Sequence, residues 1–442
     1  MRKYSELIRW ICTGAGIFMF AFPALAQSDS VLTLPQAIEL SLKNNFDIRI
    51  ASNTEQQAKN NSNPGTAGML PSVSAEGNLQ RTVTNLHQKY SSGLEVDRSN
   101  AGSDNLNGNI SLDWTIFDGM QMFTTMKKLR ELSAQGTEAF KIQVENSIEE
   151  ITAAYCEIIR QKQLLKTTQE QLVLAEERLK IADRKLANGS GSRLEFLQVR
   201  TDRNTQQVKA QQQSTALSAA RAALNRLLSR PVETAFVTVD TFPAPSARTL
   251  EGIRANLEKQ NHTLAYYRQS QNISNLSLQQ LQGKRWPVIS LNGGYLYTKL
   301  DNDAGFTLQN RNSGYTYGIT ATLPIFNGFR LNTEIKNARL DYQNAQLEYE
   351  QIRQSTEETL FVAFRQFSDN IDILNLNELN YTDAKEIMHI AQERYRVGAS
   401  NFLELKEAEQ ILEEAITNVV NSRYDVKVSE TKLQRLNGEL IQ

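Results

Sequence analysis

The chain contains one short motif twice: residues 115–119 read TIFDG, and residues 324–328 read PIFNG. Before the first copy, apolar residues alternate with polar ones, which predicts a strand. Asp118 then stands where a helix N-cap would accept hydrogen bonds from the first turn, and Asn327 stands there in the second copy. The motif therefore predicts a junction between a strand and a helix that the chain uses twice.

The similarity between the two halves extends far beyond this motif. At an offset of 209, Arg226 matches Arg435 and Gly189 matches Gly398, and no gap is needed from 110 to 230. Upstream the offset becomes 216, so that Asn45 matches Asn261. Two copies of this size predict a duplicated structural unit.

This duplication predicts how the chain is divided. We expect a first repeat over 27–230, a connector over 231–248 and a second repeat over 249–442. Each repeat would contain a helix, a pair of strands and a long helical hairpin. The expected ranges are 70–117 and 287–326 for the strand pairs, and 119–230 and 328–437 for the hairpins.

Residues 1–26 are typical of a secretory signal peptide, with a basic start, an apolar stretch and the cleavage site Ala24-Leu25-Ala26. The remaining chain is slightly acidic, so nothing in it predicts nucleic-acid binding. It retains one cysteine, Cys156, which excludes an intramolecular disulfide. We interpret Cys156 as a small buried residue of a helix, with a reactive thiol as the alternative.

Two very long helices are predicted. No Gly or Pro occurs between Phe329 and Val397, and the counterpart 120–188 contains only Gly136. A continuous helix of that length would reach about 100 Å. In both segments large residues recur every seven positions, which indicates coiled-coil packing. These residues are Ile151, Ile158, Leu165, Leu172, Leu179 and Leu186 in the first copy, and Leu360, Phe367, Leu374, Tyr381, Met388 and Tyr395 in the second.

Elsewhere the apolar pattern has a period of two. It predicts strands at 72–84 and 105–116, and two more near 289–297 and 315–323, each with one apolar and one polar face. The segments between paired strands, 85–104 and 299–313, are rich in Asn, Ser, Gly and Asp and are expected to be exposed loops.

These strands are long enough for an outer-membrane barrel. Four strands leave two open edges, which hydrocarbon cannot satisfy, so the sheet must close with other chains. The polar face predicts a water-filled lumen.

In their order and duplication these features resemble the TolC family of outer-membrane channel proteins. The resemblance rests on LTLPQAIELSLKNNFDIRIAS at 32–52, LPSVSAEGNL at 70–79, WPVISLNGGY at 286–295, the two motifs above, and RYRVGASNFLELKEAEQ at 394–410. It implies a mainly α protein with a membrane β part. In that family a homotrimer forms a twelve-stranded β-barrel, four strands per chain, continuous with a twelve-helix periplasmic α-barrel of coiled-coil hairpins.

The resemblance also implies a function and partners. The chain would be the exit duct of a tripartite efflux pump or a type I secretion system in the outer membrane of a Gram-negative bacterium. It would contact outer-membrane lipid, a periplasmic adaptor (membrane fusion protein) and an inner-membrane RND or ABC transporter. The alternative is a periplasmic coiled-coil adaptor or scaffold protein. The transported substrate, drug, metal, dye or protein, stays open.

Several residues acquire expected roles from the resemblance. Glu404 and Glu407 match the paired acidic residues that constrict the closed periplasmic entrance, and Glu195 and Tyr395 match a pair that holds the hairpins together. Solvated surface charges are the alternative for the first pair. Ser400 stands where the family has an arginine, which leaves the strength of this clamp and the closed aperture open.

The hairpin turns and the strands provide the other candidates. Gly189 and Gly398 are expected to end the long helices, either as adaptor-docking tips or as C-caps alone. An aromatic belt at the membrane surface is expected, with ordinary strand aromatics as the alternative. Its members are Trp114, Phe117, Tyr295, Tyr315 and Tyr317.

No enzymatic activity, cofactor or metal is expected. The histidines His87, His262 and His389 lie far apart in the sequence and lack metal-ligand spacing. No nucleophile and base stand at a spacing that would suggest catalysis.

Overall fold

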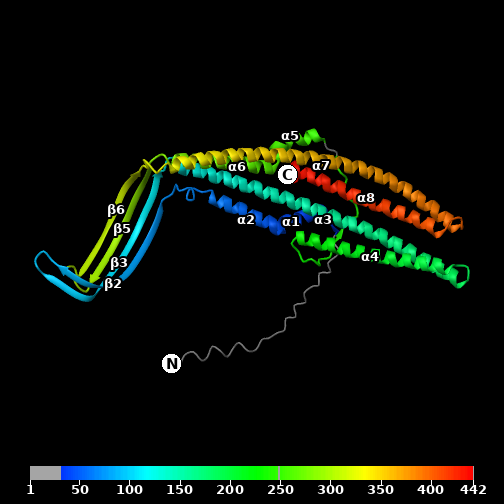
Figure 1. Cartoon of the computed structure of the whole chain (residues 1–442), viewed down its shortest axis with the longest axis horizontal. Helices are drawn as coiled ribbons and strands as arrows, with labels where there is room; N and C mark the ends of the chain where they lie inside the picture. The colour runs from blue at the N-terminus through cyan, green and yellow to red at the C-terminus, as the bar shows by residue number, and fades with distance from the viewer. Residues whose placement is uncertain (1–30, 247–248, 442) are drawn as a thin grey trace, which may run out of the picture.

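The computed structural model describes residues 31–246 and 249–441, and the expected signal peptide lies outside them. The molecule is elongated, with a sheet at one end and two long helical hairpins that extend away from it (Figure 1). The helices are α1 (Leu34–Asn44), α2 (Phe46–Asn61), α3 (Gln121–Ala187), α4 (Arg193–Leu227), α5 (Leu250–Gln260), α6 (His262–Gly283), α7 (Arg330–Arg396) and α8 (Phe402–Leu436). The strands are β1 (Val31–Leu32), β2 (Ser72–Lys89), β3 (Glu95–Phe117), β4 (Val237–Thr238), β5 (Val288–Asn302) and β6 (Gln309–Thr322).

The two predicted long helices and their return helices are confirmed. Helices α3 and α7 have 67 residues each, and α4 and α8 have 35 each. The heptad positions Ile158 and Phe367 are 1% and 3% exposed, and so pack inside their hairpins. No helix of the described residues carries an apolar stretch long enough to cross a membrane.

Strands β1 and β4 form a short two-stranded sheet. The larger sheet has the strand order β2-β3-β5-β6 and is antiparallel throughout. Side-chain hydrogen bonds cross its polar face: Ser74 Oγ lies 2.8 Å from Ser111 Oγ, and Asn292 Nδ2 donates to Asp113 Oδ1 at 2.8 Å. The apolar face is uncovered, with Val73 66% and Ile319 72% exposed. Among the described residues, β2 and β6 each have an unpaired edge.

The expected loops 85–104 and 299–313 are wrong over most of their length. Strand β2 continues to Lys89 and β3 begins at Glu95, while β5 continues to Asn302 and β6 begins at Gln309. Polar composition indicates contact with water, and a paired hairpin in water satisfies that as well as a loop does. Lys89 and Glu95, the last residue pair between β2 and β3, form an ion pair.

The junctions between strand and helix differ from the expected N-caps. The helices begin at Gln121 and Arg330, because the two residues before each are left-handed: Gly119 and Met120 at φ 71° and 68°, Gly328 and Phe329 at 65° and 61°. A side chain at Gly119 would come within 2.2 Å of the Gly283 carbonyl oxygen.

The cap residues consequently act from other positions. Asp118 Oδ2 accepts a hydrogen bond from Met122 N at 2.8 Å. Asn327 contributes only its backbone oxygen, which lies 3.4 Å from Arg330 N. The motif therefore turns the chain by backbone conformation, and a side-chain cap is secondary.

Corresponding asparagines fasten the shorter helices to the hairpins. Asn45 Nδ2 donates to the Leu227 oxygen and Asn261 Nδ2 donates to the Leu436 oxygen, both at 2.9 Å. Each side chain also accepts from the first turn of the helix that follows, α2 or α6. The same residue thus joins the same two elements in both halves.

A largely buried group of ionisable side chains lies where α6 of the second half meets α3 of the first. His262 Nδ1 is 2.7 Å from Glu138 Oε2, and His262 Nε2 is 3.9 Å from Glu145 Oε1. Burial raises the pKa of Glu145 from the ordinary 4.5 to about 7, and Glu138 adds to the effect, while Arg435 and Lys141 oppose it.

We predict that Glu145 makes the fold less stable as the pH rises. Because its folded pKa is raised, its contribution is complete below pH 4.5 and is lost as the pH passes through about 7. The free energy of unfolding should therefore fall by roughly 2 kcal/mol over this range, after allowance for solvent screening. Guanidinium unfolding of the detergent-solubilised chain at pH 5 and pH 8 measures this, and Glu145→Gln should remove most of the difference. An equal pH difference in the variant would contradict the prediction.

Candidate functional site at the ends of the helical hairpins

Glu404 and Glu407 lie one turn apart at the start of α8. Asn401 caps this helix, since its Oδ1 accepts from Glu404 N at 3.0 Å. The Glu404 carboxylate is half-exposed and pairs with Arg394 at 3.2 Å. Glu407 is exposed. Both border a groove of about 230 Å³ between α7 and α8, which is otherwise apolar and lined by Ile387, Ile390, Ala391, Ala408 and Ile411.

Glu195 and Tyr395 come from different hairpins and lie in one small pocket. Tyr395, at the end of α7, reaches over the first hairpin, where its ring centroid is 5.9 Å from Lys185 Nζ. Burial raises the pKa of Tyr395, and the nearby negative charge of Glu195 adds to the shift. Ser400, in place of the family's arginine, has a buried hydroxyl with no hydrogen-bond partner among the described residues. The structure thus brings Glu195 and Tyr395 together, with no ionic contact from position 400.

A buried cluster of four charges, which sequence reasoning missed, joins the hairpins beside this pocket. Arg178 of α3 pairs with Glu409 of α8 and, at 3.4 Å, with Asp202 of α4. Lys406 of α8 also pairs with Asp202, and lies 3.8 Å from Glu409. The four side chains are only 5–19% exposed. The residues that pair in this cluster lie up to 231 positions apart in the sequence, so no local pattern could reveal it.

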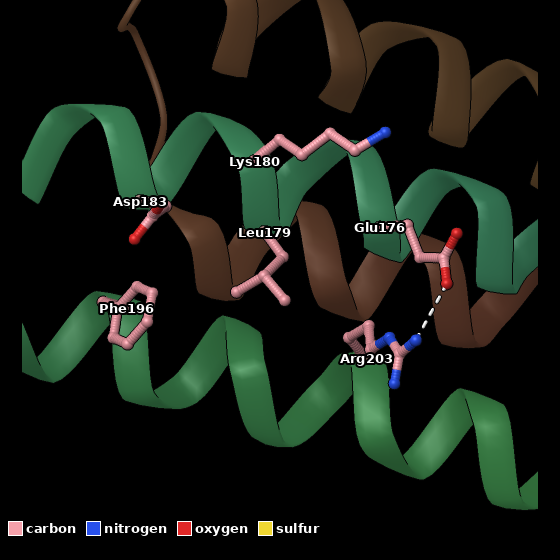
Figure 2. A pocket seen from close by; sticks show the side chains of 6 residues that line it. All are labelled: Glu176, Leu179, Lys180, Asp183, Phe196 and Arg203. Atoms are coloured by element: carbon pink, nitrogen blue, oxygen red, sulfur yellow. Dashed lines mark hydrogen bonds and ion pairs between the residues drawn. The ribbon is translucent and has the colours of Figure 1, made fainter.

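A second groove, of about 480 Å³, lies between α3 and α4 of the first hairpin. Figure 2 shows Phe196 and Arg203 of α4 facing Leu179 and Glu176 of α3, with the Arg203–Glu176 ion pair at 3.0 Å. Phe196 also lies under two guanidinium groups, those of Arg193 and Arg200. The groove therefore combines an aromatic floor with a charged rim.

The remaining candidates lie at the two ends of the molecule. Gly189 and Gly398 have φ of 72° and 76° at the hairpin turns, where no heavy atom would touch an added Cβ. Backbone conformation alone therefore favours glycine there.

The five aromatic candidates are spread along the sheet, and Tyr317 pairs with Gly293, midway between the pairs Trp114–Leu291 and Tyr295–Tyr315. Trp114 and Phe117 are near the helices, and Trp114 Nε1 donates to the Met69 oxygen at 3.0 Å. Tyr295 pairs with Tyr315, whose ring stacks on Tyr317 with centroids 6.4 Å apart. From Leu291, which pairs with Trp114, to Tyr295 the strand rises by about 13 Å.

The described residues contain no group of three or more His, Cys, Asp or Glu side chains arranged to hold a metal ion. Burial raises the pKa of the Cys156 thiol to about 12. This favours the interpretation of Cys156 as a packed core residue over a reactive thiol.

Comparison with known proteins places this architecture in context. The family described as outer membrane efflux protein matches residues 37–230 and 253–439. Outer membrane protein TolC of Escherichia coli (strain K12) is 20% identical over 96% of this chain and 85% of that protein. Alkaline protease secretion protein AprF of Pseudomonas aeruginosa is 21% identical over 95% of this chain and 87% of that protein. The Campylobacter jejuni CmeC outer membrane channel superimposes with a TM-score of 0.78 at 17% identity, covering 92% of this chain and 85% of CmeC.

We predict that the contact between the hairpins depends on a complete four-charge cluster, because loss of one member leaves buried charges uncompensated. Arg178→Met leaves Asp202 and Glu409 buried with Lys406 as their only cation in the cluster, which should lower the free energy of unfolding by about 3 kcal/mol. Arg203→Met removes a half-exposed pair on the same hairpin, which solvent screens more strongly, and should cost less than about 1 kcal/mol. Guanidinium unfolding compares the two variants, and equal losses would contradict the prediction.

Proposed function

This chain belongs to the outer membrane efflux protein family, and from that premise we propose that it works as a homotrimer embedded in outer-membrane lipid. The chain is an outer-membrane channel protein, an exit duct for efflux or type I secretion. It has a large periplasmic part. The relatives it matches are named as outer membrane proteins, which favours a channel over the alternative of a periplasmic adaptor.

The four-stranded sheet is the observation that carries the trimer proposal. It has an apolar face, a polar face with cross-strand hydrogen bonds, and unpaired edges on β2 and β6. In hydrocarbon each unpaired backbone group costs several kcal/mol. If β2 of one copy pairs with β6 of the next, three copies close a twelve-stranded barrel with the polar face inside.

We propose that the hairpin ends dock the partners of this duct. The relatives carry names of efflux pump and protease secretion components. On this basis the expected partners are a periplasmic adaptor and an inner-membrane RND or ABC transporter. The turns between α3 and α4 and between α7 and α8 are the parts of the helical region farthest from the sheet, which suits contact with an adaptor (Figure 1).

For Glu404 and Glu407 we propose a role at the periplasmic entrance. In a trimer they would form two rings of three carboxylates. Two unit charges about 10 Å apart repel by roughly 1.7 kcal/mol at an effective dielectric constant of 20. Such rings attract cations and repel anions. Glu195 and Tyr395 would hold the adjacent hairpins together in the closed state, as their shared pocket suggests.

The trimer and its location have a direct test. After membrane fractionation the chain should appear with the outer membrane, and an amine cross-linker applied to the detergent extract should give products up to three chains and no larger. Recovery in the soluble periplasmic fraction, or a ladder that ends at one or two chains, would refute the proposal.

We predict that the entrance carboxylates set ion selectivity. Glu404→Gln with Glu407→Gln should lower the permeability ratio of cations to anions by at least about threefold in planar bilayers, because the rings lose their charge. Block by multivalent cations from the periplasmic side should also weaken. A matched control is Glu386→Gln with Glu393→Gln. It removes two exposed charges from the end of α7, near the same hairpin turn as Glu404 and Glu407. Equal effects of both double variants would count against the entrance role.

A further inference from the structure

The uncovered face of the four-stranded sheet is ordered into rows by the strand register. Alternate residues of a strand lie on one face, and residues that pair across antiparallel strands share that face. Beginning near the helices, the rows contain Trp114, Leu291 and Ile319; then Val73, Leu112, Gly293 and Tyr317; then Ala75, Ile110, Tyr295 and Tyr315; then Gly77, Gly108, Tyr297 and Ser313. None of these side chains carries a charge.

The next row outward contains two positive charges side by side. Lys299 of β5 and Arg311 of β6 are direct partners across the strands, and Leu106 and Leu79 complete their row. Like charges directly opposite each other on neighbouring strands are destabilising. An anion bound to both side chains would remove this repulsion.

The chain supplies an anion to only one of these two residues. Asp301, two positions along β5, forms an ion pair with Lys299. Arg311 is exposed and forms no direct ion pair with any residue that the structure describes. Arg311 is therefore the cation of this row whose counter-ion must come from outside the chain.

The charges of the following rows are already engaged. Arg81 of β2 pairs with Asp104 at 3.4 Å, and both side chains are exposed enough for solvent to screen the pair. The carboxylate of Asp303 accepts a hydrogen bond from the Gly102 amide at 3.0 Å. Neither carboxylate forms an ion pair with Arg311.

The position of Lys299 and Arg311 matches the outer boundary of a membrane barrel. Ten positions separate Ile289 from Lys299 along β5, a rise of about 33 Å. At a strand tilt of about 40° this corresponds to about 25 Å across the membrane, the height of the apolar band of outer-membrane barrels. This end of the sheet points away from the helices (Figure 1).

We propose that Lys299 and Arg311 bind the phosphorylated headgroup of a lipid in the outer leaflet. An anion held there stands one row above an apolar surface, so the molecule that carries it should have acyl chains as well. A guanidinium group binds phosphate in a bidentate manner, and an ammonium group adds a point charge. Tyr297, in the row below, is placed as an aromatic residue of the interface.

This inference rests on the proposed trimer in outer-membrane lipid and adds the headgroup chemistry and the residues that recognise it. Because β2 and β6 are the edges of the sheet, closure of the barrel would also bring Arg81 of the next copy to the level just outside Arg311. Each trimer would then have three equivalent sites around the barrel.

Native mass spectrometry of the detergent-solubilised chain, with diphosphorylated lipid A as the added probe, tests the site. Trimers should carry bound lipid A. Lys299→Gln with Arg311→Gln should weaken this binding by roughly tenfold, because each basic residue near an anionic membrane surface adds to the attraction. Lys299→Arg with Arg311→Lys keeps both charges and should retain the binding.

The matched control is Lys89→Gln with Arg98→Gln. It makes the same change in net charge by removing two exposed cations from the outer end of the β2–β3 hairpin, beyond the proposed site. Lipid A binding should be unchanged in this variant. An equal loss in the control and in the Lys299 and Arg311 variant would overturn the inference.

The phosphate of a lipid is distinguished from other ligands by two further probes. Lipid A from which the phosphates have been removed should bind roughly tenfold more weakly, and inorganic phosphate should not displace bound lipid A. Equal binding of both forms of lipid A, or displacement by inorganic phosphate, would overturn the lipid headgroup as the ligand.

The same spectra separate this inference from the trimer on which it rests. Trimers that keep all their lipid A after Lys299→Gln with Arg311→Gln would overturn the site and leave the trimer supported. Spectra that contain only single chains would refute the proposed trimer, and the site would fail with it.

Discussion

In the hydrocarbon of a bilayer no water can bond the N–H and C=O groups at the edge of a sheet, and this constraint governs the rest of the structure. The four strands of this chain pair with one another and leave β2 and β6 as edges. Strands β3 and β5, one from each half, pair in the middle and make the two repeats parts of one sheet. Because each strand pair leads directly into a long helix, the arrangement of the sheet also sets the positions of the hairpins.

The hairpins show how one sequence, used twice, is adapted to two environments. The helices have the same lengths and ends in both halves, so the backbone plan is shared. The faces of α3 and α7 differ, because α3 meets its partner helices through charges such as Glu138 and Arg178, while α7 exposes Leu347 and Ile387 at the equivalent positions. Buried charges contribute little net stability but strongly disfavour a wrong partner, so they suit a junction whose partner is always present in the same chain.

Sequence reasoning failed where two structures satisfy the same composition. The polar segments 85–104 and 299–313 were expected to be loops, yet most of their residues extend the strands, since a hairpin in water is also polar. Asp118 and Asn327 were expected to be N-caps, and left-handed residues at Met120 and Phe329 moved the helix starts beyond them. Left-handed conformation in a non-glycine residue has no clear signal in a single sequence.

The sequence alone determined the elements and their repetition, because periods of seven and of two, glycine at turns and a constant offset are local or nearly local properties. It predicted the long helices, the four strands and the family resemblance. Only the tertiary structure decided which charges meet. Arg178, Asp202, Lys406 and Glu409 each resemble ordinary surface charges of a coiled coil, and they form one buried cluster because two hairpins lie side by side. Contacts between residues 200 positions apart depend on helix packing, which periodicity does not specify.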